Sequence, residues 1–94
     1  MTVSIQSLVV ADILDERDCQ NQKWGEQNHD PITWVGILVE EVGEFAKAAL
    51  HLRFGGPEAE ELRREAIHCA AVSLAIVECL DRGLWQWPNE EGDR

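Results

Sequence analysis

Residues 30–57, DPITWVGILVEEVGEFAKAALHLRFGGP, contain both ends of a predicted helix. Asp30 is a residue type that caps helices with its side chain. Pro31 suits the first helical position, where its missing N–H would have no partner in any case. The helix is predicted to run to about Phe54, because Gly55-Gly56-Pro57 then breaks the pattern. No stretch of the sequence alternates as a strand does, so the fold is predicted to be all-α.

Two further helices are predicted on either side of this segment. One runs from about Val3 to Trp24 and ends at Gly25. The other starts near Pro57 and ends near Arg82-Gly83, a cation followed by a helix-ending glycine. The three helices form one domain over residues 1–94, with a frayed tail at about 89–94, because a chain of 94 residues is too short for a second core.

The last predicted helix is apolar or small on nearly every side between residues 66 and 77, and such a helix is buried all round. Three helices of one chain cannot cover it, so we expect a helical bundle completed by a partner subunit, in a homodimer or homotetramer. Small side chains would allow close approach of that subunit, namely Ala66, Ala70, Ala71, Ser73 and Ala75.

Charge and hydropathy exclude several classes of function. The formal net charge is −10, which disfavours binding to a nucleic-acid polymer or an anionic membrane surface. No apolar run approaches the ~20 residues that span a bilayer, and the N-terminus lacks signal-peptide features. The three cysteines show no Cys-x-x-Cys spacing, so each is expected to be a small buried hydrophobe in a cytoplasmic protein: Cys19, Cys69 and Cys79.

Two residue pairs on neighbouring helices are suited to metal binding. Glu41 and Glu44 stand three residues apart beside a predicted core stripe of Leu38, Val42, Phe45 and Ala49. Glu65 and His68 have the same spacing where the last helix becomes apolar. If the two helices are antiparallel, both pairs lie at similar distances from the turn at 54–57 and can face each other. Each pair alone is also compatible with a solvated helix face, or with a core histidine.

The first helix carries a face that changes from apolar to polar without changing direction. Ile5, Leu8, Val9 and Ile13 are followed on that face by Asp12, Glu16, Gln20 and Lys23. Such a face indicates either a helix that runs from the core into a wet pocket or a helix end that emerges into solvent.

Residues 16–29, ERDCQNQKWGEQNH, and 38–47, LVEEVGEFAK, resemble the MazG-like nucleoside triphosphate pyrophosphohydrolases, more narrowly the short phage and bacterial members. The resemblance covers about residues 5–82. The family's acidic signature is Glu-x-x-Glu, a spacer, then Glu-x-x-Asp; Glu41, Glu44 and Glu65 match it, whereas His68 replaces the usual Asp.

The resemblance implies hydrolysis of a (d)NTP to a (d)NMP and pyrophosphate, in housekeeping of the nucleotide pool. It implies Glu41, Glu44 and Glu65 as catalytic residues, which with His68 hold Mg²⁺, with Mn²⁺ as the other candidate. It also implies that the end of the first helix borders the nucleotide. There Trp24 offers a stacking face and Lys23 a cation for phosphate, and amide side chains could read a base: Gln20, Gln27 and Asn28.

Two other functions remain open at this stage. His68 in place of Asp removes a hard, charged ligand, which is compatible with a catalytically weak nucleotide-binding or interaction module of the same fold. Glu65-x-x-His68 is also the ligand motif of di-iron and di-manganese helical bundles, in which a homodimer would supply the second copy.

Overall fold

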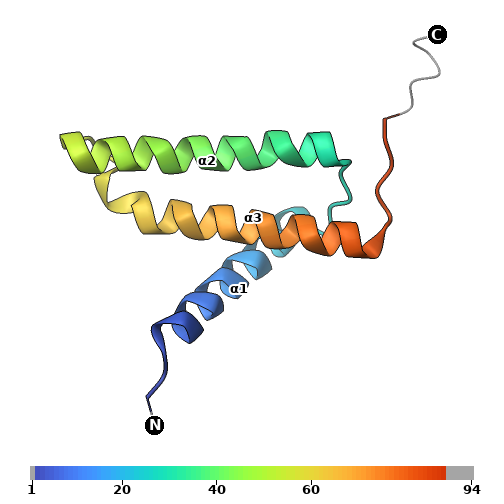
Figure 1. The fold of residues 1–94 in the computed structure, drawn as a ribbon, viewed down its shortest axis with the longest axis horizontal. Coiled ribbons are helices and arrows are strands. Elements are labelled where there is room, and N and C mark those ends of the chain that lie inside the picture. The colour runs from blue at the N-terminus through green and yellow to red at the C-terminus, as the bar shows by residue number, and fades with distance from the viewer. Residues whose placement is uncertain (1, 89–94) are drawn as a thin grey trace.

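The computed structural model describes residues 2–88 and is built from three long helices (Figure 1). Their bounds are Ile5–Trp24 for α1, Pro31–Phe54 for α2 and Leu62–Arg82 for α3, with one 3₁₀ turn, η1, at Ala59–Glu61. No strand occurs in residues 2–88, which confirms the all-α prediction. The predicted frayed tail at about 89–94 lies outside the described residues.

Both ends of α2 form as the sequence predicts. The Oδ1 atom of Asp30 accepts hydrogen bonds from the backbone N–H groups of Ile32 and Thr33 at 2.9 and 3.0 Å, and its Oδ2 atom accepts one from the Thr33 hydroxyl at 2.7 Å. These bonds lower the pKa of Asp30 below its ordinary value. Gly55 ends the helix with φ = 79°, a left-handed conformation that glycine adopts without steric cost.

The first turn of α3 begins later than predicted. The prediction started this helix near Pro57, but a turn and η1 occupy the residues before Leu62. Acidic residues favour a helix start, and here Glu60 and Glu61 lie in the first turn of η1 while Glu65 lies in the first turn of α3. Its other end is confirmed, with Gly83 at φ = 67°.

Helix α3 is the central element of the fold. Helix α2 packs antiparallel along one side of it, and α1 crosses its other side at an angle (Figure 1). Within residues 2–88, α1 packs on α3 and makes no backbone approach to α2. The sequence connects α1 to α2, but in the structure both helices pack on α3 and not on each other.

The central position of α3 explains much of its apolar composition. Ala71 and Ala75, which the sequence analysis assigned to a partner interface, are buried inside this chain. Ala66 and Ser73 remain exposed and Ala70 is half-buried, so only part of that predicted interface is still available. Completion of the bundle by a second subunit stays a prediction.

The buried face of α2 differs from the predicted stripe. Trp34 and Ala48 are its buried residues, whereas Val42, predicted to be in the core, is 48% exposed. The prediction was wrong because α2 is apolar around most of its circumference, so periodicity did not identify which face meets α3. Of the cysteines, Cys79 is buried as predicted, but Cys19 is exposed. No helix in the described part of the chain is both long and apolar enough to cross a membrane.

Candidate metal and nucleotide site

A carboxylate of α2 and a carboxylate and imidazole of α3 meet between the two helices. In Glu41, Glu65 and His68, one ligand atom from each residue lies within 4.8 Å of the others. The Nδ1 atom of His68 is 3.8 Å from Glu41 Oε2 and 3.4 Å from Glu65 Oε2. The antiparallel packing of α2 and α3 brings these residues to the same height, as their distances from the connecting turn predicted.

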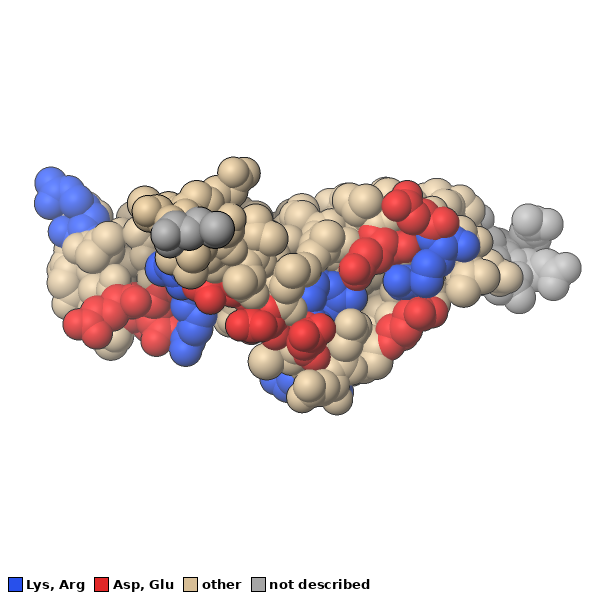
Figure 2. Space-filling model, turned by 90° about the horizontal axis from the view of Figure 1, so that it is seen from below, with Lys and Arg blue, Asp and Glu red and all other residues tan. Residues whose placement is uncertain are grey.

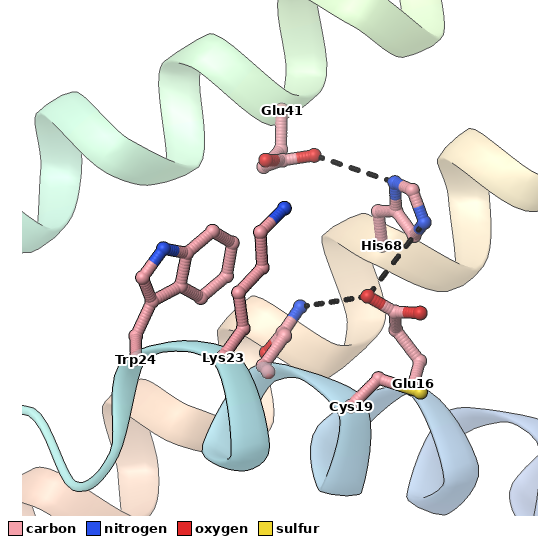
Figure 3. Close-up of a pocket in the computed structure, with 7 residues that line it drawn as sticks. Glu16, Cys19, Lys23, Trp24, Glu41 and His68 are labelled. Atoms are coloured by element: carbon pink, nitrogen blue, oxygen red, sulfur yellow. Dashed lines mark hydrogen bonds and ion pairs between the residues drawn. The ribbon is translucent and has the colours of Figure 1, made fainter.

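Helix α1 adds a third carboxylate from the opposite side. Glu16 Oε2 lies 3.7 Å from His68 Nε2, so the two nitrogens of His68 face acids on different helices (Figure 3). The sequence analysis did not assign Glu16 to the site. The available signal was the polar continuation of the apolar face of α1, which contains Glu16, Gln20 and Lys23. The structure supports the wet-pocket half of that interpretation, because Glu16, Gln20 and Lys23 line a cavity. The other half, a start in the core, was wrong, because Ile5 and Leu8 are exposed and α1 has no buried residue.

Glu44, the remaining predicted ligand, does not join this group. Its side chain is exposed, and it is not among the residues whose ligand atoms converge. A shift of three residues turns a helix by about 300°, so Glu44 is displaced around α2 by roughly 60° from Glu41. The structure therefore brings together three of the four predicted ligands, with Glu16 in addition.

The electrostatics of the group favour a cation. Burial raises the pKa of Glu41 above its ordinary value, and the nearby charges of Glu65, Glu40 and Glu44 raise it further, while His68 lowers it. Burial, followed by the charges of Glu41 and Glu65, also raises the pKa of the Cys69 thiol. Several carboxylates thus share a partly dry space in which a bound positive charge would relieve their repulsion.

Of the acidic group, Glu16, Glu41 and His68 line a cavity of about 410 Å³ between α1 and α2, and Glu65 lies outside its wall. Other lining residues come from the last turns of α1: Cys19, Gln20, Lys23 and Trp24. Gln20 donates a hydrogen bond to Glu16 at 3.4 Å, and the Lys23 ammonium lies 4.9 Å from the centre of the Trp24 ring. Lys23 and Trp24 project from α1 toward Glu41 on α2 (Figure 3).

A second, smaller cavity of about 230 Å³ adjoins the first and shares Gln20, Trp24 and Glu41 with it. Its wall is more apolar, since Trp34, Ile37, Val72 and Ala75 also line it. Gln27 lines this cavity as well, so four of the five predicted nucleotide-binding residues border one cavity or the other.

Asn28, the fifth of these residues, has a structural role instead. Arg82 donates hydrogen bonds to the Asn28 side chain and to the Gln27 carbonyl, both at 3.0 Å. Asn28 in turn donates to Glu26 at 3.1 Å. These bonds fasten the loop between α1 and α2 to the end of α3, and they hold Gln27 beside the cavity.

Two arginines outside these two cavities are paired with acids, and one of them, Arg63, borders a further cavity that also contains Glu16 and His68. Arg17 contacts Glu78 at 2.8 Å, and Arg63 contacts Asp12 at 2.6 Å. On the face shown in Figure 2, basic side chains lie next to acidic ones and form no continuous basic surface. Lys23 is the lysine that lines the larger cavity, where it is available to a negatively charged ligand.

Comparison with known proteins gives no relative: no family model, no curated protein and no solved structure matches this chain. The site must therefore be interpreted from its own geometry and from the sequence motifs it contains.

Proposed function

We propose that this chain is a metal-dependent nucleoside triphosphate pyrophosphohydrolase of the MazG-like type, which converts a (d)NTP to a (d)NMP and pyrophosphate. The observation that carries the proposal is the convergence of Glu16, Glu41 and Glu65 on His68, at the wall of a cavity that also presents a lysine and a tryptophan. Housekeeping of the nucleotide pool is the role that such an activity would serve.

The donor set fits a divalent cation that accepts oxygen and nitrogen. Octahedral ligands at 2.0–2.1 Å from Mg²⁺ stand about 3–4 Å apart, so atoms within 4.8 Å of one another need only a small contraction to bind it. Glu41, Glu65 and His68 would hold the ion, with Glu16 on its other side. The imidazole makes Mn²⁺ a good alternative to Mg²⁺. A bound ion would neutralise phosphate charge and make a bound water more acidic.

The residues of the two cavities would position the nucleotide. The triphosphate would lie beside the acidic group, with Lys23 contacting a phosphate oxygen. Trp24 borders both cavities and would stack on the base, while Gln20 and Gln27 offer donors and acceptors to its edge. The oxygen of water would attack the α-phosphorus and release its proton, and the bond from that phosphorus to the bridging oxygen would break to free pyrophosphate.

One observation favours a second function, a catalytically weak nucleotide-binding module. Both nitrogens of His68 face carboxylates, so an imidazolium could neutralise part of this acidic group without any metal ion. Glu44 also lies outside the group, which leaves fewer acids to hold a catalytic ion. This alternative predicts that the wild-type protein binds nucleotides without hydrolysing them. It also predicts that His68→Asp hydrolyses them.

The proposal is tested by pyrophosphate release from a panel of ordinary and modified NTPs and dNTPs, with Mg²⁺ and then Mn²⁺. Release that a chelator abolishes is expected, and it would be confined to the bases that the smaller cavity accepts. A metal analysis of the purified protein distinguishes this activity from di-iron or di-manganese chemistry. Absence of release from well-folded protein with both metals would overturn the enzymatic proposal.

A further inference from the structure

The wall of the smaller cavity contains a carboxylate that the acidic group does not use. Glu40 lines this cavity together with Glu41, but it is not among the residues whose ligand atoms converge with those of His68. Lys47, the lysine of α2, pairs with Glu58 at 3.2 Å and leaves Glu40 without that cation. Glu40 is therefore available to a ligand in the cavity.

The rest of this wall suits a flat and largely apolar ring. Ile37, Val72 and Ala75 contribute aliphatic side chains, and Trp24, 55% exposed, adds an aromatic residue. The volume of about 230 Å³ is below the roughly 300–1,000 Å³ of pockets that enclose a whole drug-sized ligand. The cavity is therefore sized for one part of a nucleotide, its base. The larger cavity, which shares Trp24 and Glu41 with it, would take the sugar and the phosphates.

Two polar residues of the wall can recognise the edge of such a ring, Glu40 and Gln27. The side chain of Gln20 is less free, because it donates a hydrogen bond to Glu16 at 3.4 Å. Arg82 holds Gln27 by its backbone carbonyl at 3.0 Å, a contact that leaves the side-chain amide of Gln27 available. An amide can donate or accept, whereas an ionised carboxylate can only accept. The cavity therefore requires an N–H donor from the ligand at Glu40 and tolerates an acceptor at Gln27.

We propose that Glu40 selects nucleotides whose base carries an exocyclic amino group, as cytosine and adenine do. The inference rests on the proposed function, in which the ligand is a nucleotide and Trp24 stacks on its base. The amino group would donate to the Glu40 carboxylate, and the ring nitrogen beside it would accept from the Gln27 amide. Uracil and hypoxanthine carry a carbonyl oxygen in place of the amino group, and a carboxylate repels that oxygen. A hydrogen bond to a charged group is worth roughly 10- to 100-fold in affinity, so the discrimination should be of that order.

Calorimetric titration of the whole protein with dCMP and dUMP, in the presence of Mg²⁺, tests this selection. The two ligands are matched, because they share the sugar and the phosphate and differ in the amino or carbonyl group of the base. The wild-type protein is expected to bind dCMP at least tenfold more tightly than dUMP, and AMP at least tenfold more tightly than IMP. In Glu40→Gln the amide can donate to a carbonyl oxygen as well as accept, so both ratios should fall below about threefold.

Asp18→Asn is the matched control, since it neutralises an exposed carboxylate that lines neither cavity. Its two ratios should equal those of the wild-type protein. Equal affinities of the wild-type protein for dCMP and dUMP would overturn the proposal. The proposal would also fail if Glu40→Gln bound both nucleotides more weakly but kept their ratio, because Glu40 would then act on the phosphates or the metal ion and not on the base.

Glu40→Lys gives a stronger test, because an ammonium group is a donor and not an acceptor. The added positive charge acts alike on the phosphate of dCMP and of dUMP, so it cancels in the ratio. The preference should therefore reverse, with dUMP bound more tightly than dCMP. A Glu40→Lys protein that still preferred dCMP tenfold would contradict the assignment of Glu40. Circular dichroism of each variant verifies that its helices are intact.

These measurements need no hydrolysis, so failure of this inference and failure of the proposed function can be told apart. A protein that releases pyrophosphate but binds dCMP and dUMP equally retains the proposed function and refutes the role of Glu40. A protein that prefers dCMP but hydrolyses no nucleotide loses the proposed function and retains the selection by Glu40. A protein that binds none of the four nucleotides would overturn both.

Discussion

The two opposite faces of α2 each depart from the pattern of an ordinary surface helix. Its inner face, packed against α3, contains Glu41 next to the buried residues Trp34 and Ala48. Its opposite face exposes the apolar side chains of Ile32, Val35, Val39 and Leu50. A helix that only had to stabilise this fold would have no carboxylate among its buried residues and would have polar side chains on the opposite face.

Each departure carries a free-energy cost. A half-buried carboxylate beside other acids is costly unless a cation neutralises it. An exposed apolar stripe is costly unless another surface covers it. The inner face therefore fits the cation proposed above, whereas the opposite face is an exposed apolar surface.

Glu41→Gln should have the largest effect, because it removes the charge that α2 contributes to the inner face. We expect kcat/KM for pyrophosphate release to fall about 10³-fold, equivalent to roughly 4 kcal/mol of transition-state stabilisation. Asp18→Asn, a matched change of an exposed carboxylate on α1, should leave kcat/KM unchanged. If Glu41→Gln kept a kcat/KM within tenfold of the wild-type value, the acidic group would have no part in catalysis. Because Glu44 lies outside that group, Glu44→Gln should have a smaller effect than Glu41→Gln.

Mn²⁺ should stabilise the folded protein through the same face. At 100 times its dissociation constant, a ligand that binds only the folded state adds about 2.7 kcal/mol, which raises the melting temperature of a domain this size by roughly 10–20 °C. His68→Ala should lose most of this increase, which is measured by calorimetry with and without chelator.

The same metal effect should decline with falling pH. The ligands must be deprotonated to bind, and burial raises the pKa of Glu41 above the ordinary value of 4.5. The stabilisation by Mn²⁺ should therefore start to fall at a higher pH than an ordinary glutamate would give. A Mn²⁺ effect that is equal in wild type and His68→Ala would place the ion elsewhere.

The sequence predicts the ends of the helices better than the faces that they bury. Asp30, Pro31 and Gly55 act through their own backbone and nearest neighbours, so local chemistry determines where α2 begins and ends. Which face of α2 meets α3 depends on the rotation of one helix against another. An apolar surface almost all round α2 contains no information about that rotation, and for this reason Val42 was misplaced.

The candidate site shows the same division. Glu41, Glu65 and His68 were predictable because two local motifs and one short turn fix their heights on antiparallel helices. Glu16 comes from α1, whose crossing angle on the far side of α3 no local motif determines. Asn28 lies outside both cavities for a similar reason, since its partner Arg82 lies 54 positions away in the chain.

Glu41→Gln should also raise the stability of the metal-free protein slightly at pH 7. Burial raises the pKa of Glu41 in the folded state, so ionised Glu41 opposes folding. In chelator, the wild-type protein should therefore become more stable relative to Glu41→Gln as the pH falls. The gain begins at the pKa of Glu41 in the folded state and is complete below its pKa in the unfolded state. Urea unfolding at several pH values measures the difference. A less stable Glu41→Gln would show that contact with His68 outweighs the burial of the charge.

Asp30→Asn should have the smallest effect on stability, because Asp30 lies at the start of α2, away from Glu41 and from the exposed apolar face. Asparagine retains an acceptor for the backbone N–H groups of Ile32 and Thr33 but loses the negative charge at the helix N-terminus. The lowered pKa of Asp30 stabilises the fold above the unfolded pKa near 3.8, and this contribution is lost as the pH falls through the lower folded value. The urea midpoint of Asp30→Asn should therefore lie slightly below that of wild type at pH 7 and converge with it in acid, while Asp30→Ala stays lower throughout. Equal midpoints for Asp30→Asn and Asp30→Ala would mean that the charge, and not the acceptor, is what the helix start requires.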